Sequence, residues 1–168
     1  LFGGSGYVGS KLIRALLNKN FEVVNYDRDL FGKKHLPFKN KYFHHIHADI
    51  RNINKIEKTL KKYKPTIIIH LACISNDPSF LLNSKLSREV NFDSFKNLSK
   101  IIKKFNVSRF IFASTASVYG LSKSPKVTEK HKLKPITLYN KYKAECEKVF
   151  LNEFPKNIEK CILRPSTV

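Results

Sequence analysis

The sequence contains no methionine and no apolar run long enough to cross a membrane. In a chain of 168 residues the longest candidate run, residues 66–72, has only the length of a strand, whereas a membrane-spanning helix needs about 20 apolar residues. These absences exclude a membrane-spanning, disordered, collagen-like or disulfide-scaffold protein. Because Leu1 is not a natural start, and residues 162–168 stop without a closing turn, we expect an internal piece of a longer protein, truncated at both ends.

Acidic residues are scarce, since 13 Asp and Glu stand against 32 Lys and Arg, and the net charge is +19. Such a field attracts nucleic acid or an anionic surface. Arginine, the better reader of bases and phosphates, is however much rarer than lysine, and no basic run is interleaved with stacking aromatic residues. We therefore expect solvated lysine-rich faces, with neither nucleic acid nor a membrane as the main partner.

Cysteine is also sparse. Cys73, Cys146 and Cys161 form an odd set without C-x-x-C spacing, and each lies in an apolar or helical context. This pattern is typical of reduced, buried thiols in a cytoplasmic protein.

The three neighbouring histidines, His44, His45 and His47, raise the question of a metal site. On a strand, His45 and His47 would share a face. Asp49 is the one nearby residue at ligand spacing, and it has a better use in a cofactor site. Three histidines without a fixed ligand pattern fall short of a zinc signature, so we predict no metal site.

Helical and strand-like segments alternate along the chain. Helical spacing predicts helices over residues 7–19, 53–63, 86–105 and 136–154, and short apolar runs predict strands over residues 21–26, 41–47, 66–71, 109–113 and 160–163. The apolar positions expected to face inward are Val8, Leu12, Ala15 and Leu16 in the first helix, Ile53, Ile56 and Leu60 in the second, and Val90, Leu98, Ile101 and Ile102 in the third. Residues 66–71 suit a strand buried on both sides. Alternation of this kind predicts a single α/β domain over residues 1–168, with a doubly wound parallel sheet and helices on both faces.

Three glycines lie where the first strand would enter the first helix. Gly3, Gly6 and Gly9 have the spacing G-x-x-G-x-x-G. Gly3 would permit a tight turn, Gly6 would let the backbone approach a pyrophosphate, and Gly9 would let the helix pack on the strand. The helix N-terminus would supply free N–H groups for the phosphates. The alternative is an ordinary glycine-rich turn.

Two carboxylates follow the next strands. Asp27 lies 18 residues after Gly9, where a carboxylate can accept both ribose hydroxyls of an adenosine, and this favours NAD over NADP. Arg28 follows it and leaves NADP open. Asp49 and Ile50 end the third strand, where they can frame an adenine, although Asp49 can equally be a capping or loop residue.

A tyrosine and a lysine at helical spacing are the strongest catalytic candidates. Tyr139 and Lys143 are separated by four residues, so they share one face of the predicted helix. An ammonium near the phenol lowers the tyrosine pKa from about 10 toward neutrality, which makes Tyr139 a candidate proton acceptor or donor. In so lysine-rich a chain the pair alone would be chance, but a buried strand also ends in the hydroxyl-rich segment 114–119 at the same edge of the sheet.

The order of these motifs resembles the extended short-chain dehydrogenase/reductases, in the NAD-dependent epimerase/dehydratase group that acts largely on nucleotide sugars. The resemblance extends over essentially the whole chain and implies a Rossmann-type fold. The matching segments are residues 3–9, Asp27, residues 49–50, 70–73, 90–92, 114–120, 139–143 and 163–165.

The resemblance also implies individual roles. Thr115 corresponds to the catalytic Ser or Thr, Tyr139 to the acid/base, and Lys143 to the residue that tunes the tyrosine and holds the nicotinamide ribose. The implied cofactor-binding residues are Gly3, Gly6, Tyr7, Val8, Gly9, Asp27, Arg28, Asp49, Ile50, Leu71, Ala72, Cys73, Asn91, Tyr139, Lys143 and Pro165. Cys73 stands where a smaller residue is usual.

Together these features favour the NAD-binding part of a nucleotide-sugar 4-epimerase-like enzyme, which as a full-length protein would form a homodimer. The 4,6-dehydratases of the family carry Asp-Glu where this chain has Ala116 and Ser117, so that branch is disfavoured. The alternatives are an NAD(P)-dependent reductase of keto sugars or other carbonyl compounds, and a non-catalytic module that binds nucleotides or nucleic acid. The substrate-binding region that follows in the family is missing after Val168.

Overall fold

The computed structural model describes residues 1–122 and 124–166, so Lys123, Thr167 and Val168 of the predicted domain lie outside the described residues. The strands are β1 (Val23–Asp27), β2 (Phe43–His47), β3 (Ile67–His70), β4 (Arg109–Ala113) and β5 (Glu159–Leu163). The helices are α1 (Tyr7–Asn18), α2 (Ile53–Tyr63), α3 (Asp77–Leu82), α4 (Ser84–Arg88), the π-helical turn η1 (Glu89–Asp93), α5 (Ser94–Ile102), the 3-10 turn η2 (Ala116–Tyr119) and α6 (Leu138–Glu153).

Every strand pair is parallel, as predicted. β1 pairs with β2, and β4 lies between β3 and β5. Phe2 joins the two groups of strands, because it bridges Tyr26 on one side and His70 on the other. Its N–H donates to the carbonyl of Ile69 at 2.9 Å, and its carbonyl accepts from the N–H of Leu71 at 2.9 Å. The glycine turn therefore leaves the sheet from its middle.

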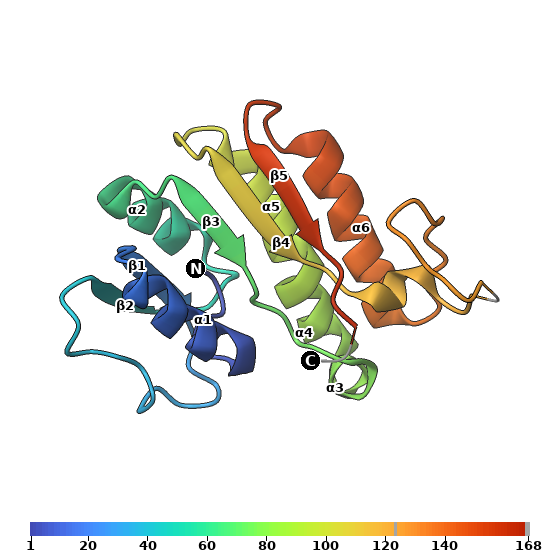
Figure 1. Cartoon of the computed structure of the whole chain (residues 1–168), viewed down its shortest axis with the longest axis horizontal. Helices are drawn as coiled ribbons and strands as arrows, with labels where there is room; N and C mark the ends of the chain where they lie inside the picture. Colours follow the sequence, from blue (N-terminus) through green and yellow to red (C-terminus); the bar gives the residue numbers. More distant parts are fainter. Residues whose placement is uncertain (123, 167–168) are drawn as a thin grey trace.

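Helices lie on both faces of the sheet, which confirms the doubly wound architecture. α1 packs on one face, where Ile13, Leu17, Val23, Leu36 and Phe43 form a small core. α2, α5 and α6 lie on the other face, over a larger core rich in phenylalanine (Figure 1). That core includes Phe95, Phe110, Phe112, Phe150 and Phe154. Full burial of one such side chain stabilises the fold by about 1.5–3 kcal/mol.

The inward face of α1 differs from the prediction. Gly9, Ile13 and Leu17 are buried, whereas Val8 is 45% exposed and Ala15 is exposed. The cause is the contact between Gly9 and the glycine turn. A β-carbon at Gly9 would lie 2.5 Å from Cα of Gly4, so the helix can approach only with its glycine turned inward. This contact sets the rotation of the helix, and the apolar spacing alone does not.

The predicted helix over residues 86–105 is divided. It begins at Ser84, passes through η1 and ends at Ile102, although its predicted inward residues Val90, Leu98, Ile101 and Ile102 are all buried. Within η1 the side-chain amide of Asn91 accepts a hydrogen bond from the N–H of Ile74 at 2.8 Å and donates one to the carbonyl of Ile74 at 2.9 Å. π-turns of this kind are frequent at functional sites. The short helix α3, which precedes this element, was not predicted.

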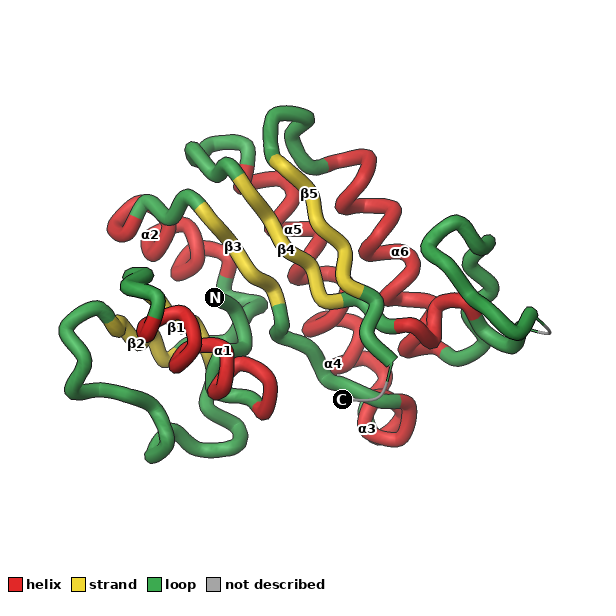
Figure 2. The backbone as a smooth tube through the Cα atoms, viewed as in Figure 1, coloured by secondary structure: helices red, strands yellow, loops and turns green. Residues whose placement is uncertain are grey.

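One face of β3 is less buried than predicted. Ile68 is buried, but Ile67 is 40% exposed, so the strand is not covered on both sides. On that side an apolar hollow of about 520 Å³ is lined in part by Ile67, Ile69 and Ile111. Figure 2 shows β3, β4 and β5 without a helix over this face in the part of the chain that the structure describes.

The packing of α1 makes a testable prediction. Gly9→Ala places a methyl group 2.5 Å from Cα of Gly4 and 2.6 Å from the carbonyl oxygen of Gly3, and both contacts are with backbone that cannot yield cheaply. We expect a loss of about 1–3 kcal/mol in the free energy of unfolding, measured by urea denaturation of the full-length protein. Gly6→Ala is the control, because its β-carbon would meet only the Gly3 carbonyl oxygen at 3.5 Å. A loss at Gly6 equal to that at Gly9 would contradict this account.

Candidate active site

The glycine turn lies at the carboxyl end of the sheet, against the end of β3. Gly3 has φ +82°, and a β-carbon there would lie 2.6 Å from the N atom of Ala72, so only glycine fits. Gly6 is the N-cap of α1, and Tyr7 and Val8 follow it on the surface. A β-carbon at Gly6 would meet the carbonyl oxygen of Gly3 at 3.5 Å and, apart from its chain neighbours, no side chain within 4 Å. The turn thus presents the unpaired N–H groups of a helix N-terminus to a gap without side chains, which fits the pyrophosphate of a dinucleotide.

Asp27 ties the glycine turn to the end of β1. Its Oδ2 accepts from the N–H of Ser5 at 2.9 Å, and its Oδ1 accepts from the N–H of Asp29 at 2.8 Å. Each carboxylate oxygen keeps a further lone pair, so Asp27 can still accept hydrogen bonds from a ribose. The structure therefore places Asp27 beside the glycine turn, where the sequence predicted it.

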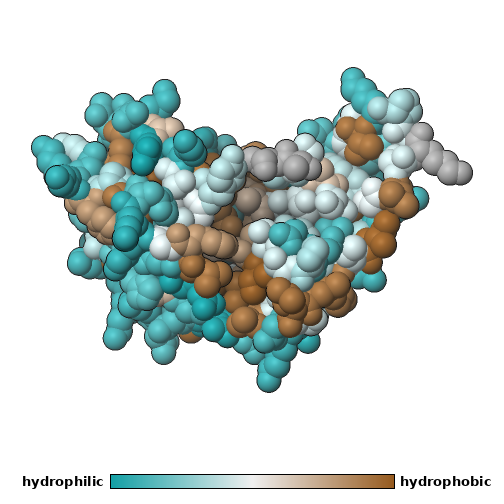
Figure 3. Space-filling model, turned by 90° about the horizontal axis from the view of Figure 1, so that it is seen from below, coloured by the Kyte–Doolittle hydropathy of each residue, from teal (hydrophilic) through white to brown (hydrophobic). Residues whose placement is uncertain are grey.

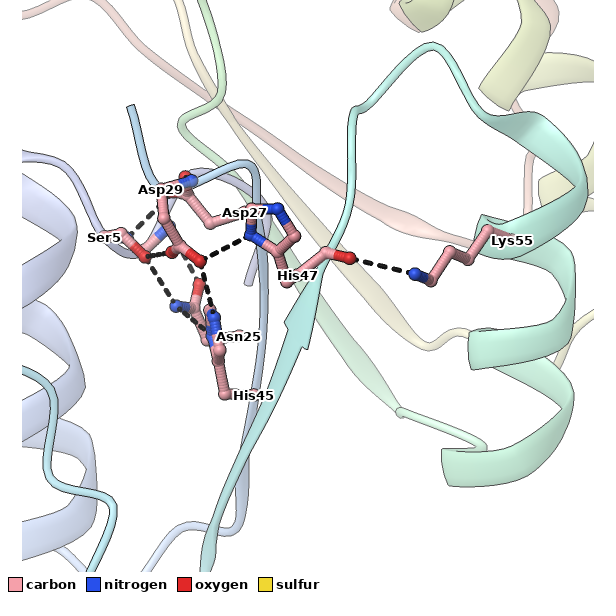
Figure 4. Close-up of polar contacts among 8 residues, drawn as sticks. Ser5, Asn25, Asp27, Asp29, His45, His47 and Lys55 are labelled. Carbon is pink, nitrogen blue, oxygen red and sulfur yellow. Dashed lines mark hydrogen bonds and ion pairs between the residues drawn. The ribbon is translucent and has the colours of Figure 1, made fainter. Parts of the chain in front are cut away.

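A cluster of Asp29, His45 and His47 adjoins Asp27 (Figure 4). One oxygen of Asp29, Oδ1, accepts from the hydroxyl of Ser5 at 2.7 Å. The other, Oδ2, lies 2.9 Å from Nε2 of His45 and 2.7 Å from Nδ1 of His47. Burial opposes the ionised form of Asp29, but hydrogen bonds from Ser5, His47 and His45 outweigh it and lower the pKa of this carboxyl below its ordinary value. Sequence analysis missed Asp29 because φ +57° in an irregular loop, and not strand spacing, brings it to the histidines.

A chain of hydrogen bonds fixes the proton on His45. Gly4 donates its N–H to Oδ1 of Asn25 at 3.0 Å, so the Asn25 amide nitrogen must donate to Nδ1 of His45 at 3.2 Å. His45 consequently carries its proton on Nε2 and donates it to Asp29. The ligand atoms of Asp29, His45 and His47 lie within 4.8 Å of one another, which the prediction of no metal site did not foresee. A metal ion would need a lone pair on Nε2 of His45, but that atom carries the proton donated to Asp29. We therefore interpret this cluster as a hydrogen-bond network that anchors the glycine turn.

Asp49 is held by arginine. Its Oδ1 accepts from Nε of Arg51 at 3.0 Å, and its Oδ2 accepts from Nη2 of Arg51 at 2.9 Å, while Arg51 also donates to Glu89 at 2.8 Å. The hydrogen bonds from Arg51 lower the pKa of Asp49. Arg28 lies 3.7 Å from Asp49, and Ile50 is buried. Asp49 also accepts from the N–H of Arg51 at 2.9 Å, so its turn-forming role, left open by the sequence, is present as well.

The segment after β3 lines the same edge of the sheet. Leu71, Ala72 and Cys73 are half-buried, and Ala72 lies against Gly3. Asn91 holds this segment through its two bonds to Ile74.

Tyr139 and Lys143 lie in the first two turns of α6, which Thr137 caps. The ammonium of Lys143 is buried, donates to the carbonyl of Ala113 at 2.7 Å, and lies 5.9 Å from the centroid of the Tyr139 ring. The predicted lowering of the tyrosine pKa is not found here. Burial raises the pKa of Tyr139, and the nearby Cys73 and Asp77 raise it further.

Thr115 and Pro165 are neighbours at the ends of β4 and β5. The N–H of Ala116 donates to the carbonyl of Pro165 at 2.8 Å, and Oγ1 of Thr115 accepts from the N–H of Ser117 at 3.2 Å. Lys143 bonds Ala113, two residues before Thr115. The hydroxyl segment, α6 and Pro165 therefore converge on one edge.

Glu147 and Arg164 form a buried ion pair that sequence analysis missed. Glu147 has a side chain only 2% exposed, and it accepts from Arg164 Nη2 at 2.6 Å and from the hydroxyl of Ser114 at 2.5 Å. Arg164 also donates to the hydroxyl of Tyr119 at 2.7 Å. The pair joins the ends of β4 and β5, η2 and α6. The sequence did contain a signal for Glu147, because it follows Lys143 by four residues and therefore shares the same helix face.

The site face is also partly apolar. Figure 3 views the molecule from the side to which the strands of Figure 1 point, and shows apolar side chains gathered there. α3 and the start of α6 contribute exposed Leu81, Leu82 and Leu138. Within the described parts of the chain, no helix is both long and apolar enough to cross a membrane.

Comparison with known proteins gives a consistent result. The family model described as "NAD dependent epimerase/dehydratase family" matches residues 1–168. A putative UDP-glucose 4-epimerase of Methanocaldococcus jannaschii is 30% identical over 169 residues, which cover 99% of this chain and 54% of the relative. The chain spans about half the length of the curated relatives that it matches.

Solved structures agree with this comparison. The UDP-Glc/GlcNAc 4-epimerase of Campylobacter jejuni superposes with a TM-score of 0.90 at 27% identity, over 97% of this chain and 51% of that one. The UDP-glucuronic acid 4-epimerase of Bacillus cereus, in complex with NAD, gives 0.82 at 27% identity, over 99% and 55%. These likenesses confirm the predicted Rossmann-type fold.

The burial of the Glu147–Arg164 ion pair predicts a larger loss of stability on removal of one partner than an exposed pair would show. Glu147→Gln leaves the guanidinium of Arg164 without its charge partner in a site where the Arg164 side chain is 18% exposed. We expect a loss of about 3 kcal/mol in the free energy of unfolding, measured by urea denaturation of the full-length protein. The matched control is Glu145→Gln on the same helix, whose pair with Lys148 is exposed and should contribute less than about 0.5 kcal/mol. Equal losses for the two variants would refute the importance of the buried pair.

Proposed function

This chain belongs to the NAD-dependent epimerase/dehydratase family, and we propose that the full-length protein is a nucleotide-sugar 4-epimerase that uses NAD and the residues Thr115, Tyr139 and Lys143. The observation that carries the proposal is the convergence of α6, the end of β4 and the glycine turn on one edge of the sheet. Ligands of such sheets bind at this edge, beyond the carboxyl ends of the strands.

The residues of the glycine turn fit NAD. In the proposed complex the pyrophosphate lies on Gly6 and the N-terminus of α1, with Gly3, Tyr7, Val8 and Gly9 shaping the turn. Asp27 accepts the adenosine ribose hydroxyls, while Arg28, Asp49 and Ile50 border the adenine. Leu71, Ala72, Cys73, Asn91 and Pro165 complete the channel toward the nicotinamide.

Two features favour NAD over NADP. Asp27 and the ionised Asp29 make the ribose end negative, which repels a 2′-phosphate. Arg28 lies 3.7 Å from the carboxylate of Asp49, so its charge is paired with that residue.

The proposed chemistry needs an acid/base beside a carbonyl or hydroxyl group. NAD, when bound, supplies the hydride acceptor and donor for the sugar carbon. Tyr139 takes the proton from the sugar hydroxyl and later returns it, and the Thr115 hydroxyl holds the same oxygen. Because burial, Cys73 and Asp77 all raise the pKa of Tyr139, the ammonium of Lys143 is needed to favour the tyrosinate.

The two residues after Thr115 help to distinguish a 4-epimerase from a 4,6-dehydratase. Ala116 and Ser117 cannot supply the acid/base pair that elimination of water requires, so a 4,6-dehydratase is disfavoured. A keto-sugar reductase would use the same three residues but would release oxidised cofactor at each turnover. A net change in nicotinamide absorbance during turnover distinguishes this reductase from an epimerase.

We further propose that the full-length protein is a cytoplasmic homodimer. The three cysteines are free thiols, as expected in a reducing compartment. Light scattering of the full-length protein tests the dimer.

Replacement of the tyrosine tests the proposed function. Tyr139→Phe removes the proton acceptor and leaves the ring in place, so we expect kcat for 4-epimerisation of a nucleotide sugar to fall by about 10²–10⁴-fold, with NAD binding retained. Tyr142→Phe is the matched control, because Tyr142 lies on the same helix, packs on Phe80 and Phe92, and has no role in the proposed chemistry.

The assay is product separation after incubation of the full-length protein with UDP-, dTDP- and GDP-glucose. Retained NAD is measured by release on denaturation. Activity of Tyr139→Phe equal to that of Tyr142→Phe would rule out the assigned role.

A further inference from the structure

Lys143 and Glu147 are opposite charges on one face of α6 that do not pair with each other. They lie four residues apart, a spacing at which side chains on a helix meet, and both are buried. Opposite charges attract strongly where water is excluded. Among the residues that the structure describes, however, Lys143 forms no ion pair, and its hydrogen bond goes to the carbonyl of Ala113 at 2.7 Å. A third group must therefore keep the two charges apart.

Arg164 is that third group, because it occupies the carboxylate of Glu147. Its Nη2 donates to Oε2 at 2.6 Å and its Nε donates to Oε1 at 3.0 Å, so the guanidinium binds both carboxylate oxygens. The hydroxyl of Ser114 donates a further hydrogen bond to Oε1 at 2.5 Å. Both oxygens of Glu147 thus have donors other than Lys143, and the charge of the carboxylate is already neutralised.

β4 brings the two charges to neighbouring residues. Lys143 bonds the carbonyl of Ala113, and Glu147 bonds the hydroxyl of the next residue, Ser114. Consecutive Cα atoms are only about 3.8 Å apart, so the ammonium and the carboxylate are fixed to adjoining points of one segment. Loss of Arg164 would let the flexible lysine side chain exchange a neutral carbonyl for a charged carboxylate.

The place where Lys143 is held matters for Tyr139. The ammonium lies 5.9 Å from the centroid of the Tyr139 ring. Burial opposes ionisation of the phenol, and Cys73 after β3 and Asp77 in α3 raise its pKa further. The positive charge of Lys143 is available to offset these effects. An ammonium drawn to Glu147 would offset them less, because its charge would be shared with a carboxylate.

Other groups around Lys143 are neutral near pH 7. The ring of Phe112 in β4 lies 5.0 Å from the ammonium. His70 at the end of β3 is buried, and burial together with Lys143 lowers its pKa to about 3. Burial raises the pKa of the Cys146 thiol in α6 to about 12. Glu147 is therefore the group that competes with Tyr139 for the ammonium.

We propose that Arg164 is a positioning residue, which binds Glu147 and thereby leaves the ammonium of Lys143 free to stabilise the tyrosinate of Tyr139. The buried ion pair then acts on the chemistry as well as on stability. The inference rests on the proposed function and adds the residue that follows β5 to its machinery. It also predicts that the two partners of one ion pair are not equivalent, since Glu147 attracts the lysine and Arg164 prevents this.

The experiment measures the ionisation of Tyr139 in the full-length protein with bound NAD. Tyrosinate absorbance is titrated with pH, and the titration of the same protein carrying Tyr139→Phe is subtracted. Arg164→Gln should raise the pH at which Tyr139 ionises by about one unit or more, because the freed carboxylate draws Lys143 away. Glu147→Gln breaks the same ion pair but removes the competing charge, so its shift should be less than about 0.5 unit.

The double variant Glu147→Gln/Arg164→Gln completes the comparison. It lacks the guanidinium but also lacks the carboxylate, and it should return the ionisation of Tyr139 to within about 0.5 unit of the wild type. The melting temperature is measured for every variant, because a purely structural role would make the shift follow the loss of stability. If Arg164→Gln does not fold, Arg164→Lys replaces it. Lysine keeps one charge but not the two-pronged contact, so a shift of about 0.5 unit is then expected.

Activity gives a second readout. The acid limb of the pH dependence of kcat for UDP-glucose reports the ionisation of the general base in the enzyme–substrate complex, so it should move in the same order. The matched control is Arg109→Gln, which breaks the exposed pair with Glu159 at the opposite ends of β4 and β5. It should shift neither the limb nor the absorbance titration.

The outcomes separate the two proposals. Equal shifts in Arg164→Gln and Glu147→Gln, or no shift in either, overturn the inference and leave the proposed function standing. A double variant that keeps the full shift of Arg164→Gln also overturns it, because the guanidinium would then act without the carboxylate. A wild type that epimerises no nucleotide sugar contradicts the proposed function, while the absorbance titration still decides the inference.

Discussion

The structure depends on the close approach of three backbone segments at the glycine turn. A β-carbon at Gly3 would meet the backbone of Ala72, and one at Gly9 would meet the backbone of Gly4. At Gly4 it would lie 2.3 Å from Oδ1 of Asn25. Because no side chain fits, the end of β3, the start of α1 and the strand β1 are held at backbone distance from one another. A β-carbon at Gly6, by contrast, would make only an ordinary contact with the carbonyl oxygen of Gly3.

Side chains of β1 and β2 extend this constraint. Asn25 accepts from Gly4 and donates to His45, and His45 donates to Asp29, which also receives the hydroxyl of Ser5. The carboxylate that the cofactor proposal needs, Asp27, is fixed by the N–H of Ser5 in the same network. At the other end of the sheet, the ion pair of Glu147 and Arg164 connects β4, β5 and α6 in the same way. Two polar networks therefore hold the two halves of the candidate site.

Short-range patterns predicted the parallel α/β architecture and the order of motifs, because alternating periodicities and glycine spacing are local properties of the chain. The bounds of α2 and β4 agree with the prediction residue for residue. Properties set by distant contacts were missed. The rotation of α1 depends on Gly4, the cluster at Asp29 depends on a loop, and the position of the Lys143 ammonium depends on the carbonyl of Ala113. The raised pKa of Tyr139 is likewise a matter of burial, which spacing cannot report.

The uncovered face of β3, β4 and β5 has a mechanical consequence. These three strands carry at their carboxyl ends the segments with Cys73, Thr115 and Pro165, and on one side they are supported by α2, α5 and α6. A group packed into the hollow beside Ile67, Ile69 and Ile111 would also restrain the strands that carry the candidate site. The hollow and the candidate site are therefore linked through the sheet itself, over the length of a strand.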